Sequence, residues 1–125
     1  MNTDQHRWNA LTKEIIGCGL RISNALGCGF LEKVYENAMV VELRKARLRI
    51  EQQKAFEIVY AGTLVGVYSA DLIVESSVIV EIKAVKSFDA IHEAQLLNYL
   101  KATGIRLGLL MNFGIPRLGI RRLIF

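Results

Sequence analysis

The sequence predicts an α/β fold in which a central mixed β-sheet of about five strands is flanked by helices. Helical periodicity is confined to residues 3–47 and 88–102, whereas the rest of the chain is rich in β-branched and aromatic residues. The second helical segment separates two strand segments, and so long a connection implies a parallel, right-handed crossover. With 125 residues and no linker, residues 1–125 are expected to form a single domain.

The N-terminal part of the chain is predicted to form two helices. Apolar residues recur at helical spacing from Thr3 or Asp4, either of which could act as the N-cap, to about Leu26. Gly27 is expected to end this helix. A second helix is expected from Phe30 to about residue 47.

The middle of the chain is predicted to form three consecutive strands. The periodicity changes at residue 50, and strand-like runs cover residues 50–60, 64–74 and 78–85, with turns at residues 61–63 and 75–77. Because the connections are this short, neighbouring strands are expected to run antiparallel.

The C-terminal part is predicted to form a helix followed by two strands. Helical spacing returns over residues 88–102, and Gly104 is expected to stop the helix. Residues 106–113 and 118–125 then complete the predicted sheet.

The composition indicates a soluble, cytoplasmic protein. Charged residues interrupt every apolar run before it reaches the roughly 18 residues that a membrane span needs. The N-terminal MNTDQHRWNALTKE lacks the basic start and apolar stretch of a signal peptide. Cys18 and Cys28 are too few for a disulfide framework and lack the spacing of a zinc site, so free thiols are expected.

The formal net charge of +4 would suit an anionic partner such as nucleic acid. The basic residues gather in two parts of the sequence, one with Arg44, Lys45, Arg47 and Arg49 and the other with Arg117, Arg121 and Arg122. A basic cluster binds phosphates in some proteins and is a solvated surface in others, so the residues alone leave both interpretations open.

Two carboxylates are predicted to face each other within the apolar strands. A three-residue turn at residues 75–77 would pair Val74 with Val78 and place Asp71 directly opposite Glu81. Like charges in this arrangement destabilise a sheet unless something positive lies between them. A register shifted by one residue would move Asp71 to the other face.

The positive charge has two candidate sources. Lys83 shares a face with Glu81 because strand side chains alternate, and a divalent cation could be coordinated by oxygen ligands. The residues alone leave two interpretations open. Either the face is hydrated and Lys83 neutralises the neighbouring carboxylates, or the carboxylates form a metal site. Two helices add candidates one turn apart, namely Glu32 and Glu36 in the second helix and Gln95 and Tyr99 in the third.

The order of these residues resembles the PD-(D/E)xK nuclease superfamily. Asp71, Glu81-Ile82-Lys83 and the QLLNY of residues 95–99 resemble its branch with a QxxxY helix, which includes RecB-type nucleases. The GFLEKVY of residues 29–35 resembles the motif of the GxxExxY family of small bacterial and archaeal proteins. The resemblance continues through GLLMNFG and covers nearly the whole chain from Ile15 onward.

The resemblance implies a restriction-endonuclease-like core and metal-dependent hydrolysis of phosphodiester bonds in nucleic acid, with DNA favoured over RNA. It implies that Asp71, Glu81 and the Ile82 carbonyl hold Mg²⁺ or Mn²⁺, and that Lys83 acts on the attacking water. It also implies that Glu32, with Glu36 as second choice, belongs to the metal shell, and that Gln95 and Tyr99 position the phosphate or the water. The implied contacts to the nucleic-acid backbone are Arg44, Lys45, Arg47, Arg121 and Arg122.

Two positions depart from the family pattern. Family members often carry proline where Cys28 stands and histidine where Ser23 stands, and neither His6 nor His92 is expected to replace that histidine. The alternative function is therefore a nuclease-like module that binds nucleic acid or a partner protein with weak or no catalysis. A purely structural salt-bridge network is the third interpretation. Because an unregulated nuclease would harm its host, control through a homo-oligomer or a partner protein is also expected.

Overall fold

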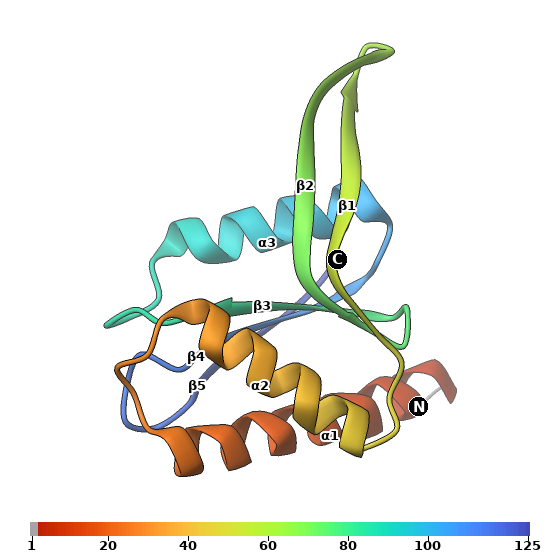
Figure 1. Ribbon diagram of the computed structural model, residues 1–125. Coiled ribbons are helices and arrows are strands. Elements are labelled where there is room, and N and C mark those ends of the chain that lie inside the picture. The colour runs from red at the N-terminus through yellow and green to blue at the C-terminus, as the bar shows by residue number, and fades with distance from the viewer. Residues whose placement is uncertain (1–2) are drawn as a thin grey trace.

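Helices cover both faces of a mixed five-stranded sheet in the computed structural model, which describes residues 3–125 (Figure 1). The elements in chain order are α1 (Thr3–Leu26), α2 (Glu32–Lys45), β1 (Ile50–Tyr60), β2 (Thr63–Val74), β3 (Val78–Lys83), α3 (Ala90–Thr103), β4 (Leu107–Asn112) and β5 (Gly119–Ile124). The predicted fold class and order of elements are confirmed. The capping role predicted for Thr3 or Asp4 involves side chains outside the described residues.

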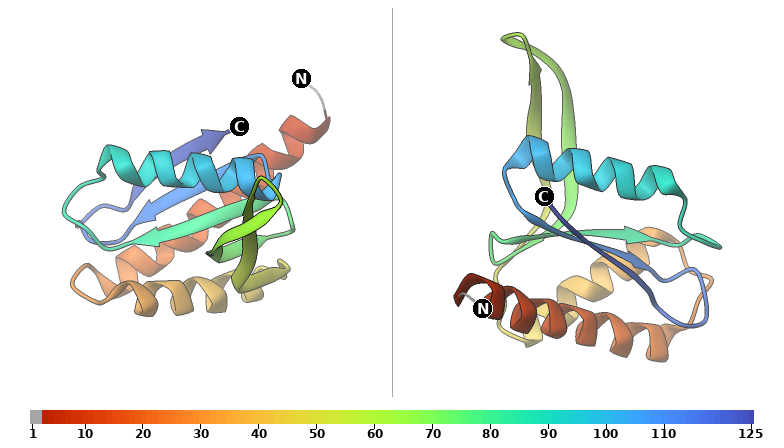
Figure 2. Two further views of the ribbon diagram at one scale, coloured as in Figure 1. Left: turned by 90° about the horizontal axis from the view of Figure 1, so that it is seen from above. Right: turned by 180° about the vertical axis from the view of Figure 1, so that it is seen from behind.

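The strand order β1-β2-β3-β4-β5 follows the chain, and α3 connects β3 to β4, which are parallel. The other neighbouring strands are antiparallel, as the short connections predicted. Helices α1 and α2 lie on one face of the sheet and α3 lies on the other (Figures 1 and 2). Within residues 3–125, none of the helices combines the length and the apolar character needed to cross a membrane.

Each face of the sheet has its own apolar core. On β3, Val78, Val80 and Ile82 pack in the core beneath α1 and α2. Ile79 packs in the core beneath α3. By strand alternation, Glu81 therefore faces α3, on the same side as Ile79.

The β2–β3 register begins as the sequence predicts, but the predicted strand pair of Asp71 with Glu81 does not form. Residues 75–77 form the turn, and Val74 pairs with Val78. The ladder then continues only as far as the pair of Leu72 and Val80. Beyond that pair β2 leaves the sheet, so no strand among residues 3–125 pairs with residues 81–83 of β3 on the β2 side.

The departing parts of β1 and β2 form a two-stranded ribbon, residues 54–70, that we call the arm. The arm stands away from the sheet beside α3 (Figure 1). The pairing of β1 with β2 omits one residue of each strand at its base, Gln53 and Asp71. A two-residue turn with φ angles of 51° at Ala61 and 78° at Gly62 closes its tip, whereas the sequence predicted a turn over residues 61–63.

Candidate active site

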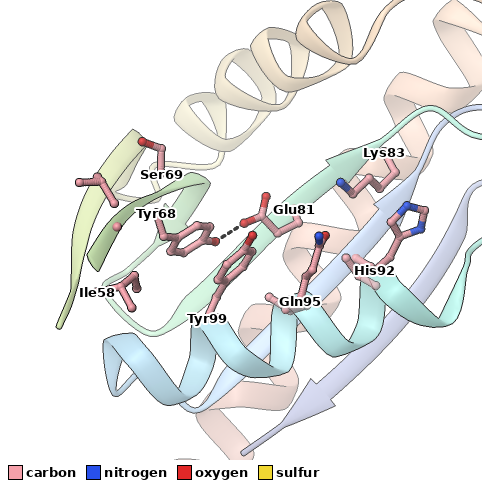
Figure 3. A pocket seen from close by; sticks show the side chains of 12 residues that line it. Ile58, Tyr68, Ser69, Glu81, Lys83, His92, Gln95 and Tyr99 are labelled. Carbon is pink, nitrogen blue, oxygen red and sulfur yellow. Dashed lines mark hydrogen bonds between the residues drawn. The ribbon is translucent and has the colours of Figure 1, made fainter. Parts of the chain in front are cut away.

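A cavity of about 400 Å³ lies between the arm, β3 and α3. Glu81 and Lys83 of β3, His92, Gln95 and Tyr99 of α3, and Tyr68 of the arm turn towards the same space (Figure 3). The remaining lining residues are Ile58, Gly66, Val67, Ser69, Leu96 and Leu110. The structure thus brings together four of the predicted site residues, two from β3 and two from α3.

The bend at the base of the arm changes which side chains of β2 face α3. Ala70 and Ile73 both pack in the core beneath α3, although they are three residues apart, whereas Leu72 packs in the opposite core. The alternation therefore shifts by one residue at the bend, as it does at a β-bulge. This shift turns Tyr68 towards α3 and into the cavity.

Asp71 lies half-buried at the bend and bonds to the edge of β3 that β2 has left. Its Oδ2 accepts a hydrogen bond from the Ile82 backbone N–H at 2.8 Å. Its Oδ1 accepts a second one from Gln53 Nε2 at 3.1 Å. The carboxylate therefore replaces the strand partner that the Ile82 N–H would otherwise lack. Asp71 does not belong to the cavity lining but borders Glu81.

Glu81 is the buried member of the carboxylate pair, with 8% of its surface exposed. Burial, together with the negative charge of Asp71, raises the pKa of Glu81 to about 9, although the Tyr68 hydrogen bond and the charge of Lys83 act in the opposite direction. The Tyr68 hydroxyl donates to Glu81 Oε1 (Figure 3). Burial and the charge of Asp71 therefore both disfavour a negative charge on Glu81.

The raised pKa of Glu81 predicts how the metal-free protein responds to pH. Glu81 binds its proton more tightly when folded, with a pKa of about 9 against 4.5 for the ordinary group. In chelator, the free energy of unfolding should therefore fall as pH rises through this window, by up to about 1.4 kcal/mol per pH unit. Urea titrations across the range should show this slope, and Glu81→Gln should lose it. Equal slopes in the two proteins would contradict the prediction.

Two stacked tyrosines form one wall of the cavity. The rings of Tyr68 and Tyr99 are stacked with centroids 3.5 Å apart. Burial, with the nearby negative charge of Glu81 and Asp71, raises the pKa of both phenols, so both stay protonated donors at neutral pH. The sequence predicted a positioning role for Tyr99 but contained no sign of its partner.

On α3, Gln95 and His92 lie one turn apart at the open side of the cavity (Figure 3). The His92 Nδ1 accepts a hydrogen bond from the Asp89 backbone N–H at 3.2 Å, and the Asp89 side chain accepts one from Ile91 N. His92 is therefore part of the capping box that begins α3, and its ring also borders the cavity.

On α2, Glu36 and not Glu32 is connected to the carboxylate pair, through Gln53. Glu36 is buried, with 4% of its surface exposed, and its Oε1 accepts from Gln53 Nε2 at 3.0 Å. Gln53 in turn bonds to Asp71. Glu32 is the first residue of α2 and is exposed. Glu36, the second choice of the sequence prediction, is thus connected to the site, whereas the first choice, Glu32, is not.

Tyr35, the tyrosine of GFLEKVY, makes contacts that hold the fold together. The Tyr35 hydroxyl donates to the Gly27 carbonyl at 2.7 Å and accepts from the Phe30 N–H at 3.2 Å. Its ring stacks on Phe113 with centroids 4.8 Å apart. Tyr35 therefore joins the α1–α2 connection to the end of β4.

The NFG of residues 112–114 holds the chain just beyond Lys83. The buried Asn112 side chain accepts from Val85 N at 3.0 Å and donates to Val85 O at 2.9 Å. The Phe113 N–H donates to the Lys83 carbonyl at 2.8 Å. Gly114 leaves room for this contact, because a Cβ there would overlap the Val85 backbone. The position of Lys83 is thereby fixed from its C-terminal side.

The basic residues do not form one surface around the cavity. Arg121 lies on the α3 side, where it pairs with Glu93 at 3.3 Å. Its neighbour Arg122 points to the other face of the sheet and bonds to Asn9 at 3.2 Å. Arg44, Lys45 and Arg47 lie at or just beyond the C-terminal end of α2, which covers the face opposite α3 (Figure 1). Strand alternation alone could have predicted the separation of Arg121 from Arg122.

The donor set around Asp71 and Glu81 suits a hard divalent cation. Because the N–H and C=O of a strand residue point to the same edge, the Ile82 carbonyl lies on the side of Asp71. Two carboxylates and a carbonyl are oxygen ligands of the kind that Mg²⁺ and Mn²⁺ prefer, and Mg²⁺ usually keeps several waters. Within residues 3–125, no three His, Cys, Asp or Glu side chains gather closely enough to hold a metal ion, so water would complete the shell.

Comparisons with known proteins show the family and the fold of the chain. Residues 9–123 match the family model of the PD-(D/E)XK nuclease superfamily. A solved structure, described as the crystal structure of SSO0001, superposes with a TM-score of 0.56 at 22% sequence identity. The match covers 97% of the present chain and 61% of that chain, so the present chain spans less than two thirds of its length and shares its fold. No curated protein matches this sequence.

Proposed function

Because the chain belongs to the PD-(D/E)XK nuclease superfamily, we propose that it hydrolyses phosphodiester bonds in nucleic acid with the help of Mg²⁺ or Mn²⁺, and acts on DNA in preference to RNA. The observation that carries the proposal is the carboxylate pair, with Glu81 buried and Asp71 half-buried, beside a lysine. Burial and, after it, the charge of Asp71 raise the pKa of Glu81, and Lys83 lies on the same strand face within the cavity. The proposed location is the cytoplasm.

In the proposed reaction, Asp71, Glu81 and the Ile82 carbonyl would hold the divalent cation. When bound, such a cation screens the negative phosphodiester from the nucleophile and lowers the pKa of water. Lys83 would orient the attacking water and offset the charge that develops on the phosphate oxygens. Its compact ammonium suits this task because it offers a point charge on a flexible stem.

The residues of α3 and α2 have supporting roles in the proposal. Gln95 and Tyr99 would position a phosphate oxygen or the water, since both reach the cavity from one face of α3. Glu36, rather than the exposed Glu32, would act on the metal site from α2, because it contacts Gln53 beside Asp71. The proposed backbone contacts to flanking phosphates are Arg44, Lys45, Arg47, Arg121 and Arg122, of which Arg121 shares the α3 side with the cavity.

A second candidate function is a nuclease-like module that binds nucleic acid or a protein with little catalysis. The observation that favours it is the state of Glu81. Its buried carboxyl accepts a hydrogen bond from the Tyr68 hydroxyl, and its pKa is raised to about 9. A carboxyl that stays protonated at neutral pH is a poor metal ligand until a cation displaces the proton. Control through a homo-oligomer or a partner protein is compatible with both functions.

Single-turnover cleavage of labelled single- and double-stranded DNA and RNA separates the two candidates. We expect slow cleavage in Mg²⁺ or Mn²⁺ that stops in chelator, with binding measured on the same preparation. Cleavage requires the cation because the phosphodiester otherwise repels the nucleophile. Tight binding without cleavage of any substrate would favour the binding module.

A further inference from the structure

We propose that Gln53 is a positioning residue that holds the Asp71 carboxylate in place for the metal ion. The inference rests on the proposed function, because it takes Asp71 to be a metal ligand. Gln53 lies on β1, outside the cavity lining, and no sequence motif described above includes it. Its backbone and its side chain support this role independently.

The backbone of Gln53 is in an unusual conformation. Its φ angle is 54°, in the left-handed region that residues other than glycine seldom adopt. It lies opposite Asp71 at the position that the β1–β2 pairing omits. A strained residue persists only where its surroundings fix it, and such residues gather at functional sites. Here the surroundings are two carboxylates that bind the side-chain amide.

The Gln53 amide connects Asp71 to the buried Glu36. Its Nε2 lies 3.1 Å from Asp71 Oδ1 and 3.0 Å from Glu36 Oε1. An amide NH₂ has two hydrogens, so each carboxylate can receive one of them. Because both partners are acceptors, the amide must present its nitrogen to them, and its orientation is therefore fixed.

Glu36 is itself held from the other side. Its Oε2 accepts from Gln52 Nε2 at 2.6 Å and pairs with Lys33 Nζ at 2.9 Å. Gln52 also donates to Asn37 Oδ1 at 2.8 Å. Glu36 is thus a firm anchor for the Gln53 amide, and it acts on Asp71 through Gln53.

The result is an Asp71 carboxylate that is fixed at both oxygens. Oδ2 accepts from Ile82 N and Oδ1 from Gln53, which leaves the other lone pairs of the carboxylate free for a cation. Groups that orient metal ligands in this way typically strengthen metal binding by about 10- to 100-fold. Without the Gln53 amide, the Asp71 carboxylate would keep one bond and could rotate away.

The test is calorimetric titration of Mn²⁺ into the full chain and two Gln53 variants. Gln53→Gly removes the amide and accepts a φ of 54° without strain, so the bend is kept. Gln53→Met keeps the side-chain length and lacks the donors. We expect both to bind Mn²⁺ about 10- to 100-fold more weakly than the wild type. The matched control is Ala55→Gly, which places a glycine at an exposed position two residues further along β1 and keeps the bonds of Gln53 to Asp71 and Glu36, with affinity expected within about twofold.

Wild-type affinity in Gln53→Gly would overturn the inference, since the bend alone would then suffice. If the wild type itself binds no Mn²⁺, the proposed function fails, and crystal structures of the wild type and Gln53→Gly decide the positioning role. An Asp71 carboxylate that leaves the Ile82 N–H in the variant would support that role. An unmoved carboxylate would overturn it.

Discussion

Replacement of Lys83 by alanine is expected to reduce the single-turnover cleavage rate by about 10²- to 10⁴-fold, with substrate affinity changed by no more than about threefold. Lys83 lies within the cavity on the strand that also carries Glu81. In the proposed reaction its ammonium meets charge that develops as water attacks. Its loss should therefore appear in the chemical step and much less in ground-state binding.

Lys86→Ala is a matched control for this experiment. Lys86 is an exposed lysine three residues further along the chain, beyond the end of β3, so the variant carries the same change in net charge. We expect it to cleave at nearly the wild-type rate. Equal residual cleavage in Lys83→Ala and the wild type would indicate a contaminating nuclease and contradict the assigned role.

Arg44→Ala should behave in the opposite way to Lys83→Ala. Arg44 is exposed at the end of α2, and a contact to a phosphate is made in the ground state and the transition state alike. If Arg44 contacts substrate, its loss weakens binding and reduces the salt dependence of affinity, because fewer counterions are released. The cleavage rate at saturating protein should then stay unchanged.

Mn²⁺ binding should be lost from both Asp71→Asn and Glu81→Gln, with affinity reduced by more than the 10- to 100-fold that outer-shell substitutions typically cost. The reason is that each substitution removes one of the two anionic ligands in the proposed shell. Calorimetric titration measures the affinity directly. Thermal melting adds a second readout, since a ligand at about 100 times its Kd stabilises a protein by about 2.7 kcal/mol.

Loss of binding in these variants should not come from unfolding. In Glu81→Gln the amide oxygen can still accept from the Tyr68 hydroxyl, so this metal-free variant should melt no lower than the wild type at neutral pH. Asp71→Asn keeps only one acceptor oxygen for the two donors, Ile82 N–H and Gln53, so its melting temperature should fall, and circular dichroism checks that it is folded before the titration. Glu57→Gln is the matched control, because Glu57 is an exposed carboxylate on the arm, away from the pair. Unchanged isotherms in both site variants would leave the salt-bridge network as the interpretation.

The sequence predicts the elements and the β2–β3 register because both depend on local signals. Periodicity marks the helices, and the three-residue turn at residues 75–77 pairs Val74 with Val78. From that pair, alternation places Glu81 and Lys83 on one face of β3, where the structure has them. The parallel β3–β4 pair follows from the helix between them.

The bend at the base of the arm could not be predicted in the same way. Strict alternation from Ile73 would turn Tyr68 away from α3, and only the shift at the bend brings its hydroxyl to Glu81. That shift depends on contacts between distant segments, such as the stacking of Tyr68 on Tyr99 and the bonds of Gln53. No short-range pattern encodes such contacts, so Tyr68 and Gln53 were missed.

The outer part of the arm has little packing against the rest of the fold. Its two strands pair only with each other, and Val59, Leu64 and Val67 are exposed. A two-stranded ribbon is marginally stable by itself, so its amides should exchange with deuterium sooner than those of β3 and β4. Because Tyr68 belongs to the arm, a local opening that reaches Tyr68 also frees the Glu81 carboxyl from its hydroxyl donor. The rate at which Glu81 loses this donor is therefore set by the opening of the arm and not by the unfolding of the whole sheet.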